Sequence, residues 1–131
     1  MPELSHRVQT FTDSVIRRMT RISDEVDAIN LSQGFPDFPP PKAITDRLRE
    51  VADEGPHQYS VTFGAENFRE ALARKQGRAY GREINPDTEI LVTCGGTEAM
   101  MSAMMSVCNP GDKVVVFSPF YENYGADAIL S

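Results

Sequence analysis

The sequence predicts an α/β fold, and three features of its second half support this. The run Ile90-Leu91-Val92-Thr93-Cys94 is apolar and mostly β-branched, as expected for a strand buried on both faces. The next segment, Thr97 to Cys108, is typical of a helix, and the turn signal Asn109-Pro110-Gly111-Asp112 follows it. A second apolar run then extends from Lys113 to Phe117. A strand, a helix and a strand in this order are typical of α/β proteins.

The rest of the chain predicts further helices and one extended loop. Apolar residues recur at helical intervals in the segments Glu3 to Asp27, Lys42 to Glu54, Glu66 to Tyr80 and Glu122 to Leu130. Gly55-Pro56 and Gly81 mark the ends of the second and third of these helices. The segment Asn30 to Pro41 contains four prolines, which remove amide donors and exclude a helix, so we expect an extended loop there.

The composition of the 131 residues narrows the class of protein, and the length suits one modest domain. The net charge of −6 argues against a nucleic-acid partner, because that interaction depends on clustered Lys and Arg. Two His and two Cys lack the paired spacing of a zinc site, so we assign no metal. There is neither a charged-then-apolar leader nor an apolar stretch of roughly 18 residues, so we expect a cytoplasmic protein without membrane contact.

The segment Cys94-Gly95-Gly96-Thr97 carries the clearest chemical signal. A predicted strand leads through two glycines into a predicted helix, where unpaired amides and the helix dipole favour an anion. Without side chains on Gly95 and Gly96, a phosphate can approach the backbone closely, and the Thr97 hydroxyl adds a donor. The alternative is that the glycines serve packing and that Thr97 is an ordinary N-cap. Neither the Walker motif nor the dinucleotide-binding fingerprint is matched.

A second candidate site follows the second predicted strand. Ser118-Pro119-Phe120-Tyr121 would lie at the edge of the sheet where α/β proteins bind ligands. An aromatic ring at this edge could cover a flat cofactor. The alternative is that Phe120 and Tyr121 close the hydrophobic core.

Four blocks of the sequence resemble the fold-type I aminotransferases of class I/II, in the family's order. The blocks are Asn30 to Pro40, His57-Gln58-Tyr59-Ser60 with Gly64 and the following helix, Leu91 to Ala99, and Pro119 to Tyr124. They are most similar to the kynurenine and glutamine transaminase type, with aspartate aminotransferases as the other related type. The resemblance implies a three-layer α/β/α domain with a mostly parallel sheet, of which this chain holds the N-terminal part. Residues 1–41 would form the N-terminal arm and substrate loop, and residues 42–131 the first part of the large, cofactor-binding domain.

The resemblance also implies a role for individual residues. The backbone amide of Gly34 would bind the substrate carboxylate. Gly96 and Thr97 would hold the phosphate of pyridoxal 5′-phosphate, together with the Tyr59 hydroxyl, which in this family reaches into the partner subunit's site. Tyr121 would stack on the pyridine ring. The position of Gly95 is often serine in aspartate-type relatives, so one side-chain phosphate donor is missing here.

Three functional residues of the family are absent from these 131 residues. The lysine that bonds to the cofactor aldehyde, the aspartate at the pyridine nitrogen and the substrate-binding arginine all lie further along the chain in relatives. Lys42, Lys75 and Lys113 lie at positions that do not suit the cofactor lysine. We therefore expect this segment to be inactive alone and to contain no catalytic residue.

The intact protein would transaminate an amino acid and a 2-oxo acid as a homodimer, although lyases and synthases of the same family remain open, as does the amino donor. Two alternatives remain, from other classes of protein. The chain could be a non-catalytic module that binds phosphate or pyridoxal phosphate, or an assembly fragment that pairs with a full-length aminotransferase.

Overall fold

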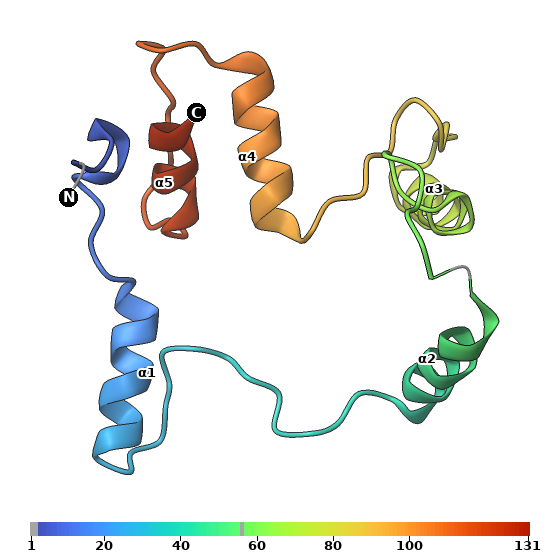
Figure 1. Ribbon diagram of the computed structural model, residues 1–131, viewed down its shortest axis with the longest axis horizontal. Helices are drawn as coiled ribbons and strands as arrows, with labels where there is room; N and C mark the ends of the chain where they lie inside the picture. Colours follow the sequence, from blue (N-terminus) through green and yellow to red (C-terminus); the bar gives the residue numbers. More distant parts are fainter. Residues whose placement is uncertain (1–2, 56) are drawn as a thin grey trace. The chain divides into compact units, whose positions relative to one another are not determined.

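The computed structural model describes residues 3–55 and 57–131. These residues form five α-helices and one short 3-10 helix, joined by irregular segments (Figure 1). The elements are η1 (His6–Val8), α1 (Val15–Glu25), α2 (Lys42–Glu54), α3 (Glu66–Tyr80), α4 (Gly96–Val107) and α5 (Asn123–Leu130). They belong to two compact units. Unit 1 comprises Met1–Asp53 and Lys113–Leu130, and unit 2 comprises Glu54–Asp112 with Ser131.

Most of the predicted helices are confirmed. α2 and α3 have the predicted bounds, α4 begins and ends one residue earlier than expected, and α5 begins at Asn123. Gly81 ends α3 in the left-handed conformation, with φ 67°, which glycine adopts at little cost. The predicted loop from Asn30 to Pro41 contains no helix, as expected.

The prediction of one continuous helix from Glu3 to Asp27 was wrong. The chain forms the short η1, turns, and begins α1 only at Val15. The physical reason is a cap: Ser14 has extended backbone angles, and its Oγ accepts the Arg17 N–H at 3.3 Å. An N-cap of this kind starts a helix at the next residue and prevents its extension backwards.

The two predicted strands are not formed in the part of the chain that the structure describes. Residues 90–94 belong to unit 2 and residues 113–117 to unit 1, and neither run has a strand beside it. The Val92 N–H does bond to the Phe63 carbonyl at 3.0 Å, but one such bond does not make a ladder. A β-branched composition indicates residues suited to a half-buried pleated surface, and it cannot supply the neighbouring strand.

Unit 1 is held together by polar contacts between its N-terminal part and α5. The Ser14 hydroxyl that caps α1 also donates to Glu122 Oε1 at 2.6 Å, immediately before α5. Arg7 Nη1 donates to the Leu130 carbonyl at the end of α5 at 3.1 Å. Two contacts far apart in sequence therefore fix both ends of α5 to the N-terminal segment.

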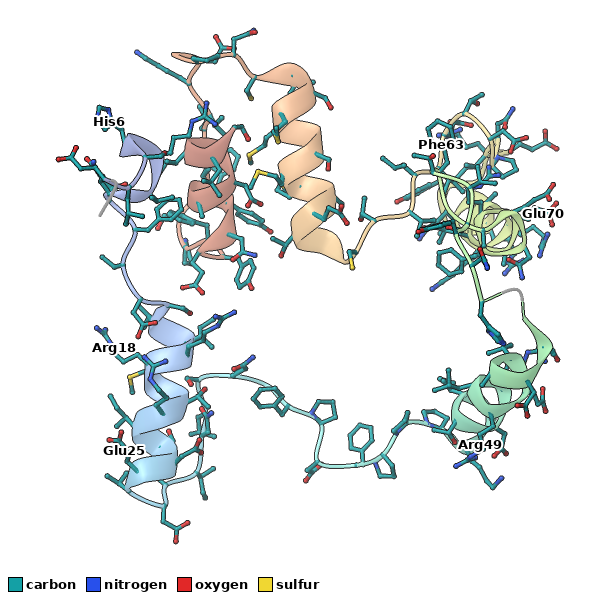
Figure 2. All side chains as sticks on the ribbon, viewed as in Figure 1. His6, Arg18, Glu25, Arg49, Phe63 and Glu70 are labelled. Atoms are coloured by element: carbon teal, nitrogen blue, oxygen red, sulfur yellow. The ribbon has the colours of Figure 1, made fainter. Side chains whose placement is uncertain are left out.

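Unit 2 is organised around the buried guanidinium of Arg69 in α3, which is 6% exposed. Its Nε donates to the Gly64 carbonyl at 3.0 Å, and its Nη1 donates to the Pro86 carbonyl and to Asp87 Oδ1, both at 2.6 Å. The segment before α3 and the turn after it are thereby tied to one helix. Figure 2 labels Phe63, which directly precedes Gly64 in that segment.

Gly64 brings the same segment against residues 90–94. Its φ is +105°, and a Cβ placed on it would overlap Val92 Cγ2. Only glycine fits there without displacement of the neighbouring backbone or side chain. Gly64 therefore fixes the spacing between the segment that holds Tyr59 and the segment that leads to Gly95.

Few apolar side chains are covered. Ala73 is the single buried hydrophobic residue among residues 3–55 and 57–131, whereas Val115 and Phe117 are 83% and 88% exposed. Leu91, in the first predicted strand, is 56% exposed. These side chains have the composition of a core, and their exposure agrees with the expectation that such segments need neighbours that the 131 residues do not supply.

Replacement of Gly64 by alanine tests the close approach to Val92. In the intact protein, Gly64→Ala is expected to lower the free energy of unfolding by about 3 kcal/mol, from backbone strain and overpacking together. Gly81→Ala is the matched control, since Gly81 also has a positive φ but no atom within 4 Å of a Cβ. It is expected to cost about 1 kcal/mol. Equal losses for the two variants in urea unfolding would contradict the proposed contact.

Replacement of Arg69 by methionine tests the buried guanidinium. The expected loss is about 2 to 3 kcal/mol, because the Gly64 and Pro86 carbonyls lose a charged donor. Asp87→Asn is the control: the Asp87 side chain is 73% exposed, so its ion pair with Arg69 is expected to contribute less than about 1 kcal/mol. Similar losses for both variants in urea unfolding would assign the stabilisation to the ion pair instead.

The stability of the fold is expected to depend on pH through Glu89. The Asn85 N–H donates to Glu89 Oε2 at 2.8 Å, and Arg82 Nη1 lies 2.7 Å from Glu89 Oε1. These contacts, the Asn85 amide first, lower the pKa of Glu89 from its ordinary 4.5. A lowered carboxyl pKa contributes stability above the ordinary pKa, and that contribution disappears as the pH falls through the folded-state pKa.

Glu89→Gln is therefore expected to be less stable than the native protein near neutral pH, with a difference that shrinks on acidification. Thermal unfolding midpoints of both proteins, measured from about pH 7 to about pH 3, test this. Glu83→Gln, a nearby neutralisation, is the control. A constant difference between native and Glu89→Gln over this range would refute the role of the Glu89 charge.

Candidate functional site

The turn before α4 has the geometry of an anion site. Gly95 adopts φ +89° and occupies the N-cap position, and α4 begins at Gly96. No atom lies within 4 Å of the place where a Cβ would stand on either Gly95 or Gly96. The first-turn amides of any α-helix lack acceptors within the helix, and the positive end of its dipole lies there. The backbone at this turn is therefore open to a phosphate-sized anion.

This geometry also bears on the alternative interpretation of the two glycines. A packing glycine has a neighbour where its side chain would be, as Gly64 does, and within the described residues Gly95 and Gly96 have none. The N-cap is Gly95, which makes no side-chain bond, so the alternative that Thr97 is the N-cap is wrong. Thr97 lies inside the first turn of α4.

Glu98 is a residue of this turn that the sequence analysis missed. Its Oε2 accepts the backbone N–H of Cys94, on the other side of the two glycines. Gly95 is held further by its own N–H, which donates to the Thr93 carbonyl at 2.9 Å, and by its carbonyl, which accepts the Thr93 hydroxyl at 2.9 Å. The sequence carries no capping-box signal for Glu98, because the N-cap is a glycine and the carboxylate bonds to the residue before it.

Tyr59 also belongs to unit 2, in the segment that precedes Gly64. Its side chain is fully exposed, at 100%. The described residues leave its hydroxyl uncovered, and its role at the phosphate stays a prediction.

Gly34 and Tyr121 belong to unit 1. The loop that carries Gly34 is anchored at its start, where Asn30 Nδ2 donates to Thr20 Oγ1 of α1 at 3.0 Å and Asn30 Oδ1 accepts the Ser32 N–H at 2.9 Å. No atom lies within 4 Å of a Cβ built on Gly34. The backbone at Gly34 is thus accessible, as binding of a substrate carboxylate would require.

The ring of Tyr121 is half exposed and meets the ring of Tyr124 edge to face, with centroids 6.2 Å apart and planes at 83°. Tyr124 also donates its backbone N–H to the Tyr121 carbonyl at 3.1 Å. An edge contact leaves the ring faces of Tyr121 available for stacking. The stacking role of Tyr121 and the packing alternative both stay predictions.

Metal ions and membranes are two other kinds of ligand that the described residues bear on. No group of three or more His, Cys, Asp or Glu residues in the ranges 3–55 and 57–131 could hold a metal ion. None of the helices in these ranges is long and apolar enough to cross a membrane. Among the lysines, Lys42 is 84% exposed and paired with Asp46 one turn later in α2.

Known proteins similar to this chain share both its sequence and its structure. The family model for "Aminotransferase class I and II" matches residues 26–131. The methionine aminotransferase of Escherichia coli strain K12 is 38% identical over 118 residues, which cover 90% of this chain and 31% of that protein. The kynurenine–oxoglutarate transaminase of Dictyostelium discoideum is 34% identical over 121 residues, covering 92% of this chain and 28% of that protein.

A solved structure of a methionine aminotransferase from Escherichia coli, YbdL, superimposes with a TM-score of 0.91 at 34% identity. The match covers 100% of this chain and 34% of that one, so the chain spans about a third of the length of these relatives. The match supports the α/β fold of pyridoxal-phosphate transferases. The described residues, however, do not form the two predicted strands. By sequence and by structure, the chain belongs to the class I and II aminotransferase family.

Proposed function

We propose that the intact protein transfers an amino group between an amino acid and a 2-oxo acid, with pyridoxal 5′-phosphate as its cofactor. One observation carries the proposal: the open backbone at Gly95 and Gly96, directly before the first-turn amides of α4. A phosphate there would meet the positive end of the helix dipole without a side chain in its way. Family membership supplies the class of reaction, and this turn supplies a place for the cofactor.

Each candidate residue would then bind or orient a group. Gly96 and Thr97 would hold the phosphate, and the exposed Tyr59 would add its hydroxyl from the partner subunit. Tyr121 would lie against the pyridine ring and exclude water from one face. The Gly34 amide would position the substrate carboxylate. The bound cofactor supplies an electron sink for the bond changes at the substrate's α-carbon.

The cofactor lysine is proposed to lie outside these 131 residues, since the chain spans about a third of its relatives. The segment alone would then be inactive, and activity would belong to a homodimer of the longer protein in the cytoplasm. The alternative is a non-catalytic segment that binds pyridoxal phosphate or assembles with a full-length aminotransferase. The intact mass of the natural protein, compared with the coding frame beyond Ser131, separates these two possibilities.

The loop around Gly34 favours an apolar or aromatic amino donor. Phe35 and Phe38 are 67% and 69% exposed, so the loop presents two rings beside the proposed carboxylate site. A side chain of the donor that covers these rings would gain hydrophobic free energy of about 25 cal/mol per Å² buried. We therefore propose aromatic amino acids as donors, and the resemblance to glutamine transaminases adds glutamine. The relative from Escherichia coli, by comparison, is a methionine aminotransferase.

Alanine at position 96 tests the phosphate turn in the intact protein. The new Cβ meets no atom of the chain, so Gly96→Ala is expected to fold normally but to occupy space in front of the helix amides. The dissociation constant of pyridoxal phosphate, followed by absorbance, is expected to rise about tenfold or more, which corresponds to about 1.4 kcal/mol. Gly125→Ala in α5, where a Cβ also meets nothing, is the control.

The same titration should be followed by assays with aromatic amino acids, glutamine and methionine as donors and a 2-oxo acid as acceptor. Cofactor binding by the native protein without transamination of any donor would remove that reaction and favour the lyase relatives. An unchanged dissociation constant for Gly96→Ala would show that the phosphate binds elsewhere.

A further inference from the structure

Glu98 places a carboxylate close to the turn that is proposed to bind a phosphate. It is the third residue of α4, and its carboxylate carries a negative charge close to the turn that would receive a dianion. Charge alone would make this residue unfavourable for cofactor binding. The structure offers a compensating role, because the carboxylate is hydrogen-bonded to the chain on the far side of the glycines.

The bond from the Cys94 N–H to Glu98 Oε2 closes a short ring around Gly95 and Gly96. These glycines are the positions with the greatest backbone freedom, and Gly95 occupies a region, φ +89°, that only glycine visits readily. A turn made of two glycines loses much conformational entropy when it is ordered. A contact that spans both glycines reduces the number of conformations that the turn can adopt before a ligand binds.

We propose that Glu98 is a positioning residue of the phosphate turn. Its carboxylate anchors the Cys94 amide and so holds Gly95 and Gly96 in the conformation that opens the first-turn amides of α4. Glu98 acts on the ligand through the backbone. The inference rests on the proposed function for the identity of the ligand, and on the described bond for the role of the side chain.

Two conservative variants of Glu98 distinguish the effect of its side-chain length from the effect of its charge. Glu98→Gln keeps the length and an acceptor oxygen but removes the charge. Glu98→Asp keeps the charge but is one methylene too short to reach the Cys94 amide in the described conformation. Glu98 is exposed, so neither change disturbs a core. Glu66→Gln and Glu66→Asp, at the first turn of α3, are the matched controls for a general effect of charge at a helix start.

The intact protein should be examined with two measurements. One is the hydrogen exchange rate of the Cys94 amide without ligand, and the other is the dissociation constant of pyridoxal phosphate. For Glu98→Asp we expect about tenfold faster exchange and about tenfold weaker binding, as for the loss of one charged hydrogen bond. For Glu98→Gln both values are expected within about threefold of native. The Glu66 variants are expected to leave both measurements unchanged.

The opposite pattern would overturn the proposal. If Glu98→Asp behaves like the native protein in both measurements, the side chain does not position the turn. If Glu98→Gln tightens binding while Glu98→Asp leaves it unchanged, the residue acts only through its charge. A native protein that binds no pyridoxal phosphate would refute the proposed function, and the exchange rates would then decide separately whether Glu98 holds the turn.

Discussion

The positive end of the α4 dipole, at a helix start with open space beside its N-cap glycine, is the constraint on which the rest of this site depends. A helix start leaves donors without acceptors, and in most proteins a capping side chain supplies one. Here the N-cap is a glycine, which supplies none, and the space beside it is open. Such a helix start is suited to a ligand that brings its own acceptor oxygens. The phosphate of pyridoxal phosphate does so, and family membership makes it the expected ligand.

The remainder of unit 2 serves to hold this turn in place. Arg69 ties the segment before α3 to the turn that precedes residues 90–94, and Gly64 lets those residues approach closely. Residues 90–94 then lead directly to Gly95. The turn is therefore supported from one side by contacts along α3 and from the other by the Glu98 carboxylate. The position of a flexible glycine pair is determined by the more rigid elements on either side of it.

The sequence predicted the helices well because their signals are local. The intervals of apolar residues and the punctuation by Gly55 and Gly81 were sufficient for α2 and α3. The N-terminal helix was misjudged because its apolar stripe is longer than the helix, which Ser14 interrupts. The strands failed for a different reason: strand pairing is a non-local property, and residues 90–94 and 113–117 have no neighbouring strand within the described chain.

For the candidate site, the two glycines pointed to Gly96 and Thr97 and the predicted sheet edge to Tyr121. The family resemblance added Gly34 and Tyr59. The roles of all five residues stay predictions. Glu98 and Arg69 were missed, because their importance lies in backbone groups that they bond to and that no side-chain pattern reveals.

A crystal structure of the intact protein grown with pyridoxal phosphate would show whether the phosphate binds at the start of α4. We expect phosphate oxygens within about 3 Å of the backbone nitrogens of Gly96 and Thr97, the distance of an N–H to oxygen hydrogen bond. A phosphate bound elsewhere, or a side chain from another part of the protein lodged against these amides, would contradict it.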